Sequence, residues 1–155
     1  MKDYRRIVVG TDFSVASMVA ARRGADLARH YESTLVLLHI IEHFPADMPD
    51  DLVAPENLDP ATFYRERACK KLAELAEKIA HMDTVQKVLM SSSSAKHEIL
   101  RFAETERIDL IVVGAHGEGA LRLFGSTAMG VIYDAPCDTI VIREQDQSAA
   151  AGAAL

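Results

Sequence analysis

The sequence predicts an α/β protein built on a doubly wound, open parallel sheet of five strands, with helices on both faces. Five short runs rich in Val, Ile and Leu have the continuous apolar character of strands buried on both sides. Segments with apolar residues at helical spacing separate these runs, so strands and helices alternate along the chain. Strict alternation favours parallel strands joined by right-handed helical crossovers. The 155 residues fit one domain, which we expect to span residues 1–144.

The first half of the chain predicts two strand–helix pairs separated by a long polar connection. Residues 42–60 hold four of the five prolines and several acidic residues, which predicts a surface loop. Asp59 is suited to cap the helix that follows, and Pro60 is suited to its first turn. The predicted elements are a strand at 6–10, a helix at 16–31, a strand at 34–41 and a helix at 60–81.

The second half predicts a weaker strand, two shorter helices and two further strands. Ser93 or Ser94 is expected to cap the third helix, which carries Ile99 on its apolar face. Ser126 is expected to cap the fourth helix, which ends before Pro136. The predicted strands are 85–90, 109–114 and 138–143, and the tail at 145–155 is expected to be disordered because it has no periodicity.

Composition and charge exclude several classes of function. The net charge of −6 and the pI of about 5.5 argue against a nucleic-acid-binding face, which needs clustered Lys and Arg. A small anionic ligand is not excluded, because backbone donors can hold a phosphate. No apolar stretch approaches the ~20 residues of a membrane span and no secretory leader is recognisable, so we expect a cytoplasmic protein. Cys69 and Cys137 are expected to be reduced and buried.

Residues that follow the first and fourth strands are the candidates for a binding site. In open parallel sheets a ligand binds beyond the carboxyl ends of the strands, where the strand order reverses. Asp12 follows the first strand, and Gly114 begins a glycine-bearing stretch that ends at Thr127. Glycines let a phosphate approach the backbone, and hydroxyls at a helix start add donors. Turn glycines followed by an ordinary serine cap are the alternative. Arg122 is the single basic residue of the stretch, so rapid phosphate hydrolysis is not predicted.

Five sequence blocks resemble the universal stress protein family, in the order that the family has them. The resemblance covers residues 4–143. It implies an adenine nucleotide alpha hydrolase-like fold with strand order 3-2-1-4-5, and a homodimer. The blocks are Ile-Val-Val-Gly-Thr-Asp-Phe-Ser at 7–14, Leu-Leu-His-Ile-Ile at 37–41, Val-Gly-Ala-His-Gly at 113–117, Gly-Ser-Thr-Ala at 125–128 and Ala-Pro-Cys-Asp-Thr-Ile-Val-Ile-Arg at 135–143.

The resemblance also implies a ligand and a role. The ligand would be ATP, ADP or AMP, with any Mg²⁺ bridged by the phosphates because no carboxylate cluster is visible in the loop. The function implied is that of a non-catalytic or slowly hydrolysing regulator in stress adaptation. By similarity, the base would rest near Gly10, Thr11, Asp12 and Ile40, the ribose and phosphate path would be lined by Val113, Gly114, His116 and Gly117, and phosphate oxygens would be held by Gly125, Ser126 and Thr127.

One departure from the family pattern leaves a second function open. Seven residues separate Gly117 from Gly125, fewer than nucleotide-binding members commonly have. The shortened loop resembles the subclass that does not bind ATP, whereas the retained glycines resemble the subclass that does. The alternative function is therefore a dimeric interaction protein without a nucleotide. A phosphorelay receiver is disfavoured, since it would need an Asp after the third strand, where this chain has serines at 91–94.

Several candidate residues also have a structural interpretation. Asp12 either contacts a ligand or caps the first helix, with Ser14 as the competing cap. His39 lies inside an apolar strand, so we expect a hydrogen-bonded structural residue rather than a catalytic one. His116 either meets phosphate or faces solvent. The acidic residues of 42–59 form either a solvated loop or a lid over the pocket.

The last strand predicts a partner. In the order 3-2-1-4-5 it is an edge of the sheet, and Ile140-Val141-Ile142 carries no charge or proline. Apolar edges invite pairing with another chain. We expect strand 138–143 to pair with its copy in a homodimer, and the alternative is that the C-terminal tail covers this edge.

Overall fold

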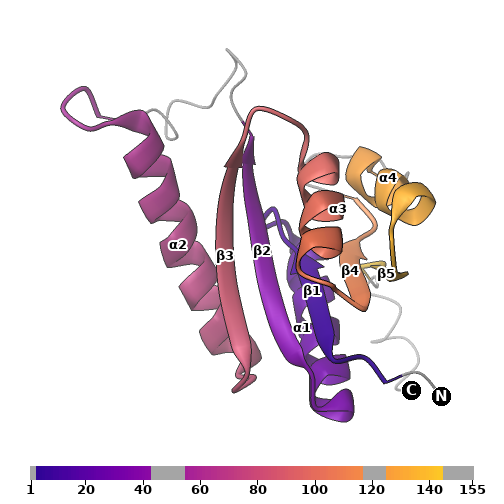
Figure 1. The fold of residues 1–155 in the computed structure, drawn as a ribbon. Coiled ribbons are helices and arrows are strands. Elements are labelled where there is room, and N and C mark those ends of the chain that lie inside the picture. The colour runs from indigo at the N-terminus through magenta and orange to yellow at the C-terminus, as the bar shows by residue number, and fades with distance from the viewer. Residues whose placement is uncertain (1–2, 43–54, 117–124, 145–155) are drawn as a thin grey trace, which may run out of the picture.

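A five-stranded parallel sheet forms the centre of the protein in a computed structural model, which describes residues 3–42, 55–116 and 125–144 (Figure 1). The strand order is β3-β2-β1-β4-β5 and every neighbouring pair is parallel, so the predicted architecture and order are confirmed. In chain order the elements are β1 (Arg6–Gly10), α1 (Val15–Tyr31), β2 (Thr34–Glu42), α2 (Pro60–Ile79), β3 (Thr84–Ser91), α3 (Ala95–Thr105), β4 (Leu110–Gly114), α4 (Ser126–Asp134) and β5 (Asp138–Ile142).

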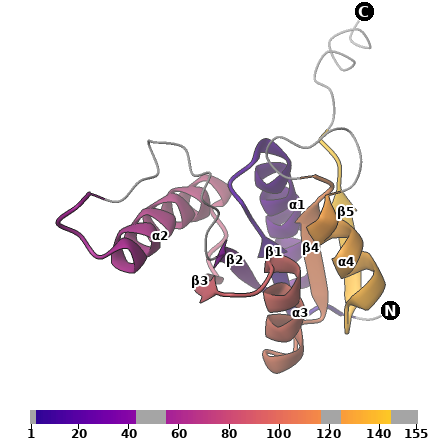
Figure 2. The ribbon, with the colours of Figure 1, turned by 90° about the horizontal axis from the view of Figure 1, so that it is seen from above.

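Two apolar cores hold the layers together, one on each face of the sheet. Alternate side chains of β2 point to opposite faces, as the period of a strand requires. Leu35 and Leu37 therefore pack with α1 and α2, and Val36 and Leu38 pack with α3 and α4. Figure 2 shows α1 on the opposite side of the sheet from α3 and α4. The central strands are buried on both sides, which explains their unbroken apolar sequences.

Helix caps and boundaries follow the sequence closely, with small differences at the ends. Asp59 Oδ2 accepts the Thr62 N–H at 3.0 Å, and Ser94 rather than Ser93 caps α3. The predicted end of α2 near residue 81 is wrong, because Ala80 adopts a left-handed conformation and ends the helix at Ile79.

Two predicted strands lose one terminal residue each. Residue 109 lies just before β4, and its carboxylate accepts the backbone N–H groups of Arg5 and Arg6 at 2.9 and 3.0 Å. Asp109 thereby ties the start of β1 to the start of β4 rather than extending the strand. At the other end of the sheet, β5 finishes at Ile142, one residue earlier than expected.

The prediction that both cysteines are buried is wrong. Cys69 is exposed and Cys137 is only partly buried. The buried face of α2 is formed by Ala68, Leu72, Leu75 and Ile79, and Cys69 is one position, or about 100°, away from that face. No helix within the described residues is long and apolar enough to cross a membrane.

The predictions of an acidic lid, within 43–54, and of a disordered tail at 145–155 lie outside the described residues.

The sheet has one position where the direction of strand order reverses. β1 pairs with β2 on one side and with β4 on the other. The connection after β1 therefore runs toward β2, and the connection after β4 runs the other way, toward β5. The carboxyl ends of β1 and β4, Gly10 and Gly114, lie at the same edge of the sheet. This is the position at which open α/β sheets form a crevice.

Candidate functional site

A cavity of about 320 Å³ opens at this reversal point. Its volume lies within the range of about 300–1,000 Å³ that is usual for small-molecule sites. Apolar side chains from β2, β4 and α3 form one wall, and polar residues after β1 and at the start of α4 face it. The lining residues are Gly10, Thr11, Asp12, Ser17, Leu38, Ile40, Ala95, Ile99, Val113, Gly114, His116, Gly125, Ser126, Thr127 and Ala128.

The cavity brings together ten of the eleven residues proposed from the sequence. Gly117 is the eleventh and lies outside the described residues, as does the shortened loop that follows it. Sequence reasoning missed five lining residues. Leu38 lies two positions before Ile40 and so shares its face of β2, a signal that strand period alone supplies. The other four belong to helices whose approach to the sheet depends on the tertiary structure: Ser17, Ala95, Ile99 and Ala128.

The turn between β1 and α1 is fixed by short hydrogen bonds. The Thr11 N–H donates to the Leu38 carbonyl at 2.9 Å, which continues the sheet one residue past β1. Thr11 Oγ1 lies 3.0 Å from Ser17 Oγ and accepts the Phe13 N–H at 3.1 Å. The Thr11 side chain therefore has two hydrogen-bond partners and its backbone a third, although the residue lines the cavity.

Ser14, not Asp12, caps α1. Ser14 Oγ accepts the Ser17 N–H at 3.3 Å, and Ser14 has the extended backbone of an N-cap. Asp12 Oδ1 instead accepts the Ser14 N–H at 3.0 Å, which forms a local turn just before the helix. Because the cap is supplied by Ser14, Asp12 lines the cavity without also having to cap the helix.

His39 supports the cavity wall from the opposite face of the sheet. Its Nδ1 lies 2.7 Å from the Thr11 carbonyl oxygen, and a carbonyl only accepts, so Nδ1 carries the proton. The ring also packs against Phe13, with centroids 4.5 Å apart. Burial lowers the pKa of His39, while the hydrogen bond to Thr11 and the nearby Asp12 act the other way and Lys71 adds to the lowering. This environment agrees with the structural role expected from the sequence.

Replacing His39 by Asn is expected to reduce the acid sensitivity of the fold. Because the folded-state pKa is below the ordinary value of 6.5, the unfolded chain gains this proton first as the pH falls. The contribution of His39 to the free energy of unfolding is complete above pH 6.5 and is lost as the pH falls through the folded-state pKa. Asn can still donate to Thr11 and does not titrate. Urea unfolding at pH 7 and pH 5 should show a smaller loss for H39N than for the wild type.

The exposed His30 on α1 offers the control for this measurement. The variant H30N removes an exposed histidine away from the Thr11 carbonyl, and its loss of stability between pH 7 and pH 5 is the comparison for that of H39N. Equal pH dependence of H39N and wild type would contradict the role given to His39.

Helix packing requires glycine at Gly114 and leaves little room for a side chain at Gly10. A Cβ on Gly114 would lie 2.9 Å from the carbonyl carbon of Ala16 and 3.0 Å from the Ser17 nitrogen, which are backbone atoms of α1. A Cβ on Gly10 would lie 3.1 Å from Ile99 Cδ1 on α3. Because these strand ends have no side chain, α1 packs closely on Gly114 and α3 packs closely on Gly10. Glycine at either position does not by itself indicate a phosphate site.

The N-terminus of α4 meets the cavity without a side-chain cap. The sequence-based assignment of Ser126 as the cap is wrong: Gly125 is the N-cap, and Ser126 is the first helical residue. The other three helices are capped by Ser14, Asp59 and Ser94. Since Gly125 offers no side-chain oxygen, the first-turn N–H groups of α4 receive no such bond, and the helix dipole favours an anion there.

The described residues contain no cluster of three or more His, Cys, Asp or Glu side chains suited to a metal ion. Asp12 and His116 are the ionisable side chains among the described residues that line the cavity. The described lining thus offers backbone donors, hydroxyls, one carboxylate and one imidazole.

Together, the 3-2-1-4-5 parallel sheet and the cavity at its reversal point define an α/β protein with the adenine nucleotide alpha hydrolase-like fold. The chain belongs to the universal stress protein family, whose sequence profile matches residues 3–143. Universal stress protein A homolog 1 of Coxiella burnetii is 33% identical over 140 residues, which cover 90% of this chain and 96% of that protein. The solved structure of UspA from Lactobacillus plantarum has a TM-score of 0.71 at 28% identity, over 92% of this chain and 100% of that one.

Two other similar structures contain adenine nucleotides. A universal stress protein in complex with cAMP has a TM-score of 0.64 at 22% identity, over 91% of this chain and 98% of that one. The universal stress protein of Archaeoglobus fulgidus in complex with dAMP has a TM-score of 0.63 at 22% identity, over 91% and 99%. At these identities the likeness shows a shared fold, and the two complexes show that relatives bind adenine nucleotides.

Proposed function

We propose that this protein binds an adenine nucleotide, ATP, ADP or AMP, in the cavity at the carboxyl edge of the sheet. The observation that carries the proposal is that the cavity meets the start of α4, which has no side-chain cap. An apolar wall suits a base, and helix N–H groups without a side-chain cap suit a phosphate. The relatives that bind cAMP and dAMP support the same class of ligand.

In this proposal the two ends of the cavity hold different parts of the nucleotide. Ile40 and Ile99 supply the apolar wall for the base, and Asp12 offers an acceptor for a hydroxyl or amino group. Ser126 and Thr127 at the start of α4 hold phosphate oxygens. Any Mg²⁺ would be bridged by the phosphates, because the described lining contains a single carboxylate.

We further propose that the protein is a regulator that hydrolyses ATP slowly or not at all. The cavity lining within the described residues includes neither Lys nor Arg to stabilise charge on a transferring phosphoryl group. Among the described lining residues, Asp12 and His116 are the only side chains that could act as a base. Residues 1–144 act as one domain in this proposal.

The proposed functional form is a homodimer joined through β5. This strand is an edge of the sheet, and Ile140, Val141 and Ile142 remain partly exposed. None of the three carries a charge, so the edge lacks the protection that lysines or prolines usually give. Antiparallel pairing with a second copy would cover it.

Native mass spectrometry of freshly purified protein tests both proposals in one measurement. We expect a mass of twice the 17.0 kDa chain plus bound adenine nucleotide. Addition of ATP–Mg at about 100 times its Kd should raise Tm by roughly 5–10 °C through mass action. A dimer without nucleotide and without a thermal shift at millimolar ATP would instead support an interaction protein that acts through its dimer surface.

A further inference from the structure

Two helix N-termini border the cavity, and they differ in whether the protein's own acceptors already occupy them. α4 contributes Ser126 and Thr127 to the lining, has no acidic residue in its first turn and has no side-chain cap. α3 contributes Ala95, and its first turn is surrounded by acceptors. Ser94 Oγ accepts the His97 N–H at 3.3 Å, and Glu42 Oε1 accepts the Ala95 N–H at 2.5 Å. One helix start is therefore available to an anion and the other is occupied by the protein's own carboxylate.

The strand register explains how Glu42 reaches α3. Glu42 is the last residue of β2 and pairs with Ser91, the last residue of β3. The chain turns after Ser91 and enters α3 four residues later, so the first turn of the helix lies over both strand ends. The residue at each strand end then contacts that first turn.

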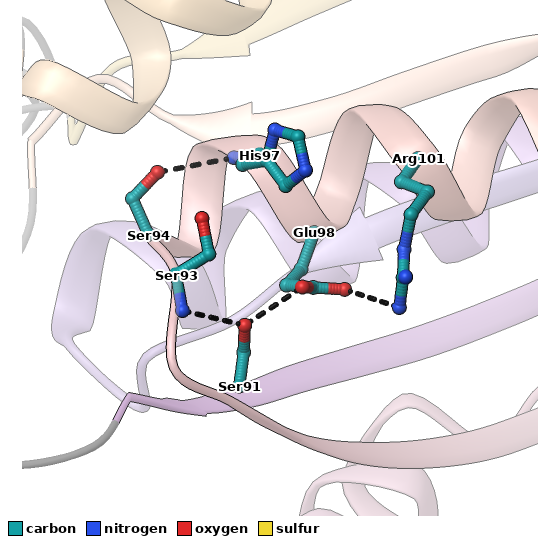
Figure 3. A network of polar contacts seen from close by, with 6 residues as sticks. All are labelled: Ser91, Ser93, Ser94, His97, Glu98 and Arg101. Carbon is teal, nitrogen blue, oxygen red and sulfur yellow. Dashed lines mark hydrogen bonds and ion pairs between the residues drawn. The ribbon is translucent and has the colours of Figure 1, made fainter.

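A polar network fixes this arrangement (Figure 3). Ser91 Oγ donates to Glu98 Oε1 at 2.7 Å and accepts the Ser93 N–H at 2.9 Å. The other oxygen of Glu98 forms an ion pair with Arg101 at 2.9 Å. The buried Glu98 thus has its charge balanced by a cation on its own helix.

Glu42 differs from Glu98 in its partner. Its hydrogen bond goes to an uncharged backbone N–H, so the bond uses the donor without cancelling the negative charge. The carboxylate therefore adds repulsion toward any second anion at the α3 side of the cavity. It also already occupies the backbone donor of Ala95 that a phosphate would need there.

We propose that Glu42, which borders the cavity through its bond to the lining residue Ala95, is a specificity-determining residue that disfavours phosphate at the α3 end and leaves α4 as the anion-binding end. This inference rests on the proposed function and deepens it, because it names a residue that enforces the direction in which the nucleotide lies. The base side of the ligand faces α3, and the phosphate side faces α4.

Binding of adenosine and AMP to the variant E42Q tests this role. Gln keeps an oxygen that accepts the Ala95 N–H, so the helix start is preserved and only the charge is removed. Isothermal titration at low salt should show adenosine binding unchanged within about twofold and AMP binding tightened about threefold, as one unit charge at ~10 Å predicts. At about 1 M salt the gain for AMP should disappear, because the Debye length falls to about 3 Å.

The variant E104Q is the matched control. Glu104 is exposed near the other end of α3, about 14 Å along the helix axis from Ala95, so its removal changes the net charge equally but acts on the cavity from farther away. E104Q should therefore change the ratio of AMP to adenosine affinity less than E42Q does.

Two outcomes would overturn the inference while leaving nucleotide binding intact. One is an affinity ratio that stays at the wild-type value in E42Q or shifts equally in E42Q and E104Q. The other is equal weakening of adenosine and AMP in E42A with no change in E42Q, which would make Glu42 only a helix cap. Failure of wild-type protein to bind either ligand would instead overturn the proposed function, and the inference with it.

Discussion

Replacing Ser126 by Asp is expected to weaken binding of AMP and ATP by tenfold to a hundredfold while leaving adenosine binding unchanged. Ser126 is the first residue of α4, lines the cavity and is exposed. A carboxylate at this position competes with phosphate for the N–H groups of the helix start and repels it at about 4 Å, which costs roughly 1–4 kcal/mol. An acidic residue in the first turn favours the helix itself by about 0.3–1 kcal/mol. The fold should therefore persist while phosphate is excluded.

The variant S126N separates charge from size. Asn matches Asp in shape and carries no charge, so AMP should bind to S126N within about fivefold of wild type. Titration calorimetry with adenosine, AMP and ATP gives the affinities, and thermal unfolding followed by circular dichroism checks the fold. Wild-type affinity of S126D for AMP would mean that the phosphate lies away from α4, against the proposed geometry.

Most of the fold could be predicted from the pattern of strands and helices, because a strand buried on both faces has a continuous apolar sequence. β4 reads Leu-Ile-Val-Val-Gly, and each of its first four residues is buried. The position of the cavity could also be predicted, since parallel connectivity brings the ends of β1 and β4 to one edge. Local caps were predictable where a single candidate stood at the right distance, as Asp59 does before Pro60.

Caps were left open or assigned wrongly where the position of the helix start was not fixed by the sequence. Asp12 and Ser14 are both good caps and the sequence left the choice open, because it depends on where the chain leaves β1. Gly125 and Ser126 differ by one position, and the backbone rather than the residue type makes Gly125 the cap. A propensity scale assigns the better capping side chain, whereas the structure places that side chain inside the helix, where it faces the cavity.

Other features depend on contacts between distant segments and left no local signal. The bond from Glu42 to Ala95 needs the register of β2 on β3 and the turn that follows β3. Gly114 resembled a phosphate-loop glycine, but its lack of a side chain is required by the backbone of α1. The sequence shows where such a glycine lies but not which packing neighbour excludes a side chain at that position.

Replacing Gly24 by Ala is expected to destabilise the protein by about 1–2 kcal/mol, although Ala is the better helix former. The added Cβ would lie 2.4 Å from Val9 Cγ2 and 3.6 Å from Leu35 Cδ1. Val9 is fully buried in β1 and β-branched, so its methyl group has no free space to enter. Overpacking of this kind costs about 1–3 kcal/mol, which outweighs the gain of up to about 1 kcal/mol in helix propensity. Urea unfolding should show a lower midpoint with an unchanged m-value.

Gly130 provides the matched helical glycine with the opposite expectation. A Cβ there would meet Lys96 Cδ at 2.2 Å, but this atom belongs to a flexible chain whose ammonium is partly exposed. Lys96 can turn away at the cost of its exposed ion pair with Asp134, which is worth about 0–1 kcal/mol. The helix gains up to about 1 kcal/mol from Ala, so G130A should be neutral or slightly more stable. Equal losses in G24A and G130A would contradict this explanation, because they would show that the fate of the added methyl does not depend on the neighbour it meets.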